Sequence, residues 1–97
     1  MPTYIILASW TDQGIRNVKE APNRVEAARK AVEAAGGKWL GFYLTMGKYD
    51  MVVISEGQND ESVAATLLAI GSGGNVRTET LRAFSEAEAR QIIAKIP

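Results

Sequence analysis

Apolar residues occur along this chain both in short continuous runs and in stripes at helical spacing. Two runs are continuous, residues 5–7 within Thr3–Trp10 and residues 51–54 within 51–56. A strand that is apolar on both of its faces is typical of the interior of a sheet that is covered on both sides. We therefore predict a first strand at 3–10 and a third strand at 51–56, both central in a sheet.

The stretch from Trp39 to Ser55 is predicted to be a hairpin. Its first arm belongs to a second strand, predicted at residues 38–46, along which the polarity of the side chains alternates. The turn Met46-Gly47-Lys48 leads from this arm to the second one. Gly47 supplies the positive φ that a tight turn needs. Asp50 lies just past this turn, so we expect it at the mouth of the sheet.

Two segments between the predicted strands have helical spacing. Residues 11–18 predict a short helical turn that Pro22 stops, because the residue before a proline avoids the α region. A longer helix is then predicted from Asn23, as its cap, to about Ala35, with Glu26 completing a capping box before Gly36-Gly37 ends the helix. Its apolar stripe consists of Val25, Ala28, Val32 and Ala35.

Two more helices flank the last predicted strand, residues 76–84. The first is indicated by acidic residues around Asp60 and ends at the glycines of 71–74; it carries Val63, Leu67 and Ile70 inward. Ser85 and Glu88 form a capping box that opens the second. The apolar stripe of this C-terminal helix consists of Ala89, Ile92, Ile93 and Ile96.

This order of elements predicts an α+β fold, a single domain over residues 1–97. It is a ferredoxin-like βαββαβ sandwich with a four-stranded antiparallel sheet, plus a C-terminal helix, and strands one and three lie in the middle. Two helices can cover only one face of such a sheet. We expect the other face to pack against the sheet of a second copy, with the C-terminal helix as the alternative cover.

Composition narrows the chemistry. The 97 residues include 11 basic and 11 acidic side chains but neither histidine nor cysteine. Disulfides and thiolate metal sites are thereby excluded, and the commonest general base and haem ligand are missing. We expect no cofactor and no bound metal. The scattered Lys and Arg residues favour neither nucleic acid nor a membrane as partner, and we expect a cytoplasmic protein.

Seven residues are candidates for binding a ligand. Tyr49 and Asp50 could orient an amino group at the mouth of the sheet, although Asp50 could instead accept backbone N–H bonds of the turn. Thr78, Thr80 and Arg82 alternate along the last strand. We expect them to share a polar pocket with Ser9 and Tyr43, or with Thr45; an exposed sheet edge is the alternative.

The chain resembles the GYD-domain family in the stretch from Phe42 to Ile54, in the segment Gly74–Phe84 and in the helix stop at Gly36-Gly37. Lys48 interrupts the name-giving triplet. The resemblance implies a dimeric α+β barrel type of fold. A more distant likeness is to the ligand-binding domains of Lrp/AsnC-type regulators, which oligomerise and bind small effectors at subunit interfaces.

Three classes of function remain open. The first is a homo-oligomeric small-ligand-binding or sensing module, with its site at the sheet face or subunit interface. The second is a structural oligomerisation module. The third is a cofactor-independent monooxygenase or isomerase, which without histidine would use Asp50, Glu79 or a tyrosine as base. Fold alone does not separate them.

Overall fold

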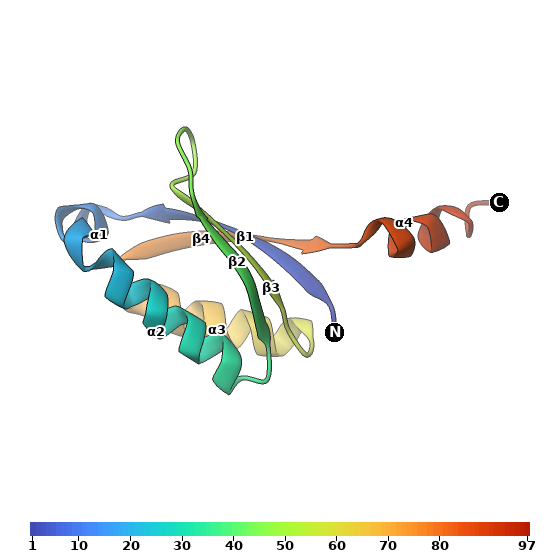
Figure 1. Ribbon diagram of the computed structural model, residues 1–97, viewed down its shortest axis with the longest axis horizontal. Helices are drawn as coiled ribbons and strands as arrows, with labels where there is room; N and C mark the ends of the chain where they lie inside the picture. Colours follow the sequence, from blue (N-terminus) through green and yellow to red (C-terminus); the bar gives the residue numbers. More distant parts are fainter.

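A computed structural model describes residues 1–97 as a four-stranded antiparallel sheet with two long helices on one face (Figure 1). The strands lie in the order β2-β3-β1-β4, which confirms the predicted α+β topology with strands one and three in the middle. The elements are β1 (Thr3–Trp10), α1 (Asp12–Arg16), the 3-10 turn η1 (Val18–Glu20), α2 (Ala21–Ala34), β2 (Lys38–Leu44), β3 (Met51–Glu56), α3 (Asp60–Ser72), β4 (Val76–Ala83) and α4 (Glu86–Ile93).

The two central strands bury alternate side chains. Tyr4, Ile6 and Ala8 of β1 are buried, and so are Met51, Val53 and Ser55 of β3. The intervening residues of both strands are only half-buried. Since successive side chains of a strand point to opposite faces, one face of the sheet is covered by α2 and α3 and the other is not. We call the second one the open face.

The core lies between the sheet and the two long helices. Tyr4, Ile6 and Val53 form its buried centre, against which Trp39, Phe42, Val63 and Leu67 pack. The Tyr4 hydroxyl donates a hydrogen bond of 2.5 Å to Asp60, which ties the first turn of α3 to β1. Only eight of the 97 residues are buried, so the single subunit has a small core.

The start of α2 differs from the prediction. The helix begins at Ala21 and not at Asn23, and Pro22 lies in its first turn instead of stopping the preceding segment. A first-turn proline is tolerated because its missing N–H has no partner within the helix. The predicted capping role of Asn23 is wrong, since no side chain caps α2 and the Asn23 amide donates to Glu20.

The helices α3 and α4 have side-chain caps at their N-termini. Asn59 caps α3, and Ser85 and Glu88 form the predicted capping box of α4. Beyond β4, α4 projects away from the sheet and makes the molecule elongated, 51 × 30 × 18 Å (Figure 1). Its apolar residues Ile92, Ile93 and Ile96 are exposed.

The β2–β3 hairpin also projects from the body (Figure 1). β2 ends at Leu44, two residues earlier than predicted, and a register shift interrupts its pairing with β3 between Trp39 and Gly41. Gly47 has the predicted positive φ, at 113°. Thr45 closes the base of the loop by donating its backbone N–H to the Asp50 carbonyl at 2.8 Å.

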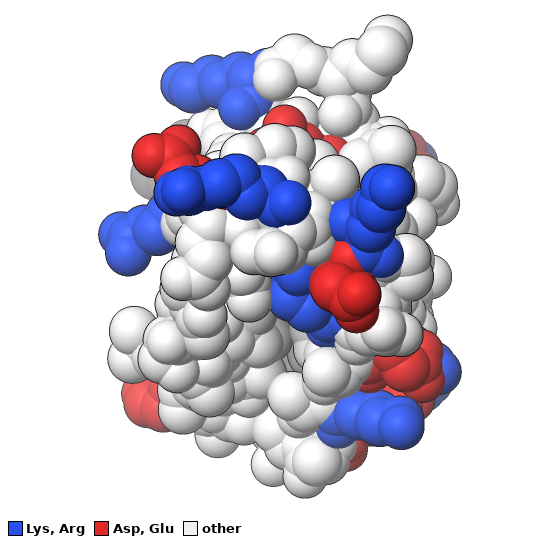
Figure 2. All heavy atoms as spheres, turned by 90° about the vertical axis from the view of Figure 1, so that its left-hand side faces the viewer, with Lys and Arg blue, Asp and Glu red and all other residues white.

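The surface is mixed in charge. Basic and acidic side chains are interspersed among uncharged atoms at the end of the molecule that carries α1 (Figure 2). None of the helices has the length and apolar character needed to cross a bilayer.

Candidate functional site

The open face has an apolar centre. Ile5 lies directly opposite Ile54 of β3 and Leu81 of β4, and Leu7 lies directly opposite Val52. Directly paired residues of neighbouring strands place their side chains on the same face. These five side chains therefore form one contiguous apolar patch with no helix over it.

Polar groups adjoin this patch. Glu79 of β4 is opposite Leu7, and its carboxylate accepts a hydrogen bond from the Tyr49 hydroxyl, which links the β2–β3 loop to β4. This hydrogen bond, together with desolvation, raises the pKa of Tyr49 above its ordinary value. Ser9 and Tyr43 also lie on the open face, because Tyr43 is paired with Val52 and Ser9 is two residues from Leu7 on β1.

Asp50 has a structural contact that the sequence did not indicate. Its carboxylate accepts the backbone N–H of Trp10 at 3.0 Å, and its own N–H donates to the Ala8 carbonyl at 2.9 Å. The predicted bonds to the N–H groups of its own turn are not present. Asp50 instead extends the pairing of β1 with β3 past the end of the strand.

The pocket predicted to combine Thr78, Thr80 and Arg82 with Ser9 and Tyr43 is not formed. The three β4 residues are opposite Ala8, Ile6 and Tyr4, which are the side chains that β1 buries under the helices. Thr78, Thr80 and Arg82 therefore lie on the helix-covered face, and Ser9 and Tyr43 lie on the open face. The register of β4 against β1 decides this, and alternation within one strand does not reveal it.

Arg82 is engaged at the end of the sheet. Its guanidinium lies 4.3 Å from the Phe84 ring centroid and donates to the carbonyl oxygens of Ala83 and Thr3. Thr80 is exposed, whereas Thr78 is half-buried. Among the three, only Thr78 lines a cavity.

That cavity lies between the helices and the sheet and has a volume of about 350 Å³. Of its 20 lining residues, 17 are hydrophobic, and they include Trp10, Trp39 and Phe42. The helix α2 contributes mainly small side chains, among them Ala28 and Ala31. Alanines are too short to reach across to the sheet, which accounts for the space.

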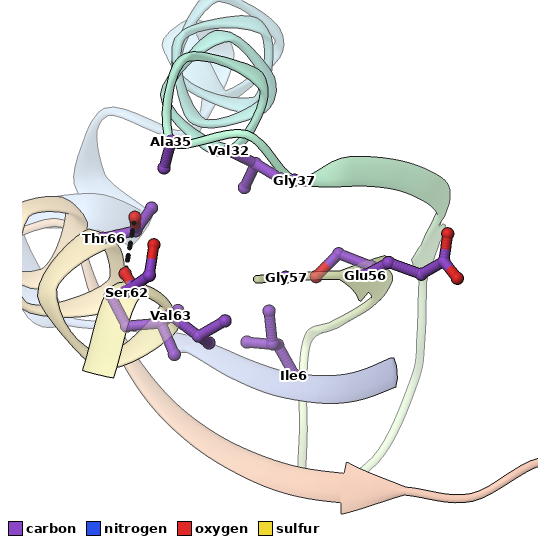
Figure 3. Close-up of a pocket in the computed structure, with 11 residues that line it drawn as sticks. Ile6, Val32, Ala35, Gly37, Glu56, Gly57, Ser62, Val63 and Thr66 are labelled. Carbon is purple, nitrogen blue, oxygen red and sulfur yellow. Dashed lines mark hydrogen bonds between the residues drawn. The ribbon is translucent and has the colours of Figure 1, made fainter. Parts of the chain in front are cut away.

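A smaller hollow of about 20 Å³ lies at the C-terminal end of α2 (Figure 3). Ile6, Val32 and Leu67 line both spaces. In Figure 3, Val32 of α2 and Ala35, just past the end of that helix, face Ser62 and Thr66 of α3 across the hollow, with Ile6 below them. The larger cavity is therefore the only one of the two with room for an organic molecule.

Arg24 is the one charged residue that lines the cavity. Its guanidinium donates to the carbonyl oxygens of Asn17 at 3.0 Å and Gly14 at 3.2 Å. Sequence reasoning did not select this residue. The signal was present in the helical period, because Arg24 precedes Ala28 by four residues and Ala31 by seven, which places it on the inward stripe.

No three Asp or Glu side chains are grouped in a way that could hold a metal ion. The chemistry available at the open face is therefore that of a tyrosine hydroxyl, a carboxylate and a serine hydroxyl around an apolar patch. The chemistry available in the cavity is that of an apolar space with one cation in its wall.

This chain is similar to a protein of Thermus thermophilus named glutamine synthetase and cystathionine beta-lyase binding protein. The two are 33% identical over 89 residues, which cover 91% of this chain and 94% of the relative. A crystal structure of a Thermus thermophilus protein superposes with a TM-score of 0.56 at 28% identity, covering 88% of this chain and 95% of that one.

Two regulators of Mycobacterium tuberculosis share the fold. The feast or famine regulatory protein complexed with L-methionine gives a TM-score of 0.67 at 16% identity over 88% of this chain. The leucine response regulatory protein gives 0.57 at 15% identity over 87%. This chain spans 51% of the length of each regulator. The predicted likeness to Lrp/AsnC-type domains is thus confirmed at the level of fold.

The family model of the GYD domain matches residues 4–93, and this chain belongs to the GYD domain family.

Proposed function

We propose that the protein is a homo-oligomeric binding module in which the open face of one subunit packs against the open face of another. The observation that carries the proposal is the uncovered apolar patch of Ile5, Leu7, Val52, Ile54 and Leu81. Contiguous apolar patches on soluble proteins mark interaction sites. The small core of the single subunit supports the same reading, because a second sheet would complete the burial of both central strands.

A second copy fits this face for reasons of symmetry. In a two-fold arrangement the same patch meets itself, so an apolar centre meets an apolar centre. Two stacked sheets lie about 10 Å apart, with their inward side chains interdigitated. The patch consists of Ile, Leu and Val side chains, which are large enough to interdigitate in such an interface.

The target of the module, we propose, is another protein. The name of the Thermus thermophilus relative states that it binds two enzymes, and this chain aligns with 94% of that relative. The β2–β3 hairpin offers a contact surface, since it projects from the body and exposes Leu44 and Met46, the latter completely. Hydrogen bonds from Thr45 to Asp50 and Tyr49 hold the base of the hairpin in one conformation.

The test uses purified glutamine synthetase and cystathionine beta-lyase encoded by the same genome as this chain. Each enzyme is mixed with the protein and analysed by sedimentation velocity. We expect a complex with at least one enzyme, weakened by Met46→Lys and unaffected by Leu68→Lys, which alters another exposed apolar residue, on α3. If the protein forms a complex with neither enzyme, the protein-binding proposal is contradicted.

A small ligand at the subunit interface is the second candidate. The Tyr49–Glu79 hydrogen bond supports it, because covering the open face would enclose this pair together with Ser9 and Tyr43. Such a site would suit a small molecule that carries an amino group for the Glu79 carboxylate. Thermal-shift screening with amino acids, in the wild type and in Glu79→Gln, tests it. A stabilising ligand whose effect survives Glu79→Gln would exclude this site.

A further inference from the structure

The cavity between α2, α3 and the sheet lies on the opposite side of the sheet from the open face. Its formation follows from the sequence of α2, whose inward stripe is rich in alanine where the sheet presents Trp10, Trp39 and Phe42. Closing such a space by collapse would require the helix to move toward the sheet. The N-terminal part of α2 resists this movement, because the Arg24 guanidinium donates to the carbonyl oxygens of Gly14 and Asn17, which precede the helix.

We propose that this cavity binds a small monocarboxylic acid with an apolar body, and that Arg24 holds the carboxylate. This site is separate from the surfaces used in the proposed function and does not depend on them. The positive charge of Arg24 favours a carboxylate, and the apolar walls of the cavity favour an apolar body.

Arg24 has an unpaired charge. A guanidinium carries five N–H donors, and Arg24 uses two of them on neutral carbonyl oxygens. The two ion pairs of the molecule are Arg29–Glu26 and Arg90–Glu86, so no carboxylate neutralises Arg24. Arg24 is half-buried, and a half-buried guanidinium without a carboxylate partner, beside an otherwise almost entirely apolar wall, favours an anionic partner.

The volume sets the size of the body. An apolar cavity of about 150 Å³ in a protein interior is enough to bind benzene. The cavity here is about 350 Å³ and thus accommodates an aromatic ring with a short aliphatic chain. Asn75 and Thr78 are the only other polar residues of the wall, so a larger polar molecule would lose hydrogen bonds to water on entering.

The test is a fluorescence titration with phenylpropionate and with phenylpropanol, which has the same body without the charge. Trp10 and Trp39 are the only tryptophans of the chain and both line the cavity, so their emission reports an occupant. We expect the acid to bind about ten-fold more tightly than the alcohol, the size of one charge-assisted contact. Equal affinities, or no change in emission with either compound, would overturn the proposal.

Two kinds of variant locate the site. Arg24→Gln keeps an amide donor for the neighbouring carbonyls but removes the charge, and we expect it to bring the acid and the alcohol to equal affinity. Ala31→Leu adds volume inside the cavity, whereas Ala34→Leu makes the same change at an exposed position of α2. We expect Ala31→Leu to weaken both compounds at least about ten-fold while Ala34→Leu binds as the wild type does.

The melting temperature of Ala31→Leu tests independently whether the cavity exists in solution. If the space exists in solution, the added side chain fills it and the variant melts no lower than the wild type. If α2 already packs closely on the sheet, the larger side chain overpacks the core and lowers the melting temperature. Ala28→Leu, in the same wall, repeats the measurement. A fall in both variants would overturn the proposal, as would binding in Ala31→Leu at wild-type affinity.

Discussion

Leu7 of β1 lies directly opposite Val52 of β3, at the centre of the face that carries no helix. Both side chains are half-buried in the single subunit, although each belongs to a strand whose alternate residues are buried. The Leu7–Val52 pair therefore gains little free energy of burial within the single subunit. The arrangement is understandable if a second sheet completes the burial.

A lysine at Leu7 is expected to separate the subunits. The charge would have to be desolvated at the middle of an apolar interface, which the free subunit does not require. We expect Leu7→Lys to sediment as a monomer with unchanged far-ultraviolet circular dichroism. The control is Leu68→Lys, on the outer surface of α3, which should retain the wild-type mass. Retention of the wild-type mass by Leu7→Lys would place the interface elsewhere.

The positions of the strands were predictable because the two central strands carry continuous apolar runs, a pattern that an edge strand does not need. The bounds of β1 and β3 were predicted correctly for this reason. Pro22 misled the prediction of α2, since a proline ends a helix from within but is accommodated in its first turn. Local rules favoured both outcomes, and tertiary packing chose between them.

The candidate site was harder to predict. Whether Thr80 shares a face with Ser9 depends on how β4 pairs with β1, and no local pattern encodes that register. The role of Asp50 likewise involves Trp10, 40 residues away in sequence. The sequence placed Tyr43 and Tyr49 in the hairpin but did not indicate which residues of the other strands they would lie near. The hydrogen bond between Tyr49 and Glu79 required the assembled sheet.

Removing the Asp50 carboxylate is expected to destabilise the fold. Asp50→Ala leaves the half-buried N–H of Trp10 without its acceptor, at a cost of about 1 to 2 kcal/mol in the free energy of unfolding. Asp50→Asn keeps an oxygen that can accept and should lose less than half of that. Urea unfolding measures both. Equal stability of Asp50→Ala and the wild type would show that this bond contributes nothing.

Gly47 and Gly71 form a matched pair of glycines. A Cβ at either position would meet no atom within 4 Å, but Gly47 has a φ of 113° whereas Gly71 lies within α3. Gly47→Ala is therefore expected to cost on the order of 1 to 3 kcal/mol through backbone strain alone. Gly71→Ala should stabilise by about 0.5 to 1 kcal/mol, because alanine favours the helix. Thermal melts of the two variants should shift in opposite directions.

Tyr4 predicts how stability depends on alkaline pH. Burial, and then its hydrogen bond to Asp60, raise the pKa of Tyr4 above the ordinary value of 10.0. The folded state thus holds this proton more tightly than the unfolded state does. The resulting stabilisation is complete below the unfolded pKa and is lost as pH rises through the folded pKa.

The free energy of unfolding should therefore fall as pH rises beyond 10.0, and Tyr4→Phe should flatten this fall. Urea titrations at neutral and alkaline pH measure the slope. An identical slope in Tyr4→Phe would mean that another group governs the alkaline behaviour.

The mass of the protein in dilute solution tests most directly whether the open face is an interface between copies. Sedimentation equilibrium at micromolar concentration is the measurement, on protein without an added tag. A mass of twice 10.5 kDa, or a higher multiple, is the predicted result. A single species of 10.5 kDa would contradict it, because the patch around Leu7 and Val52 would then remain exposed to water.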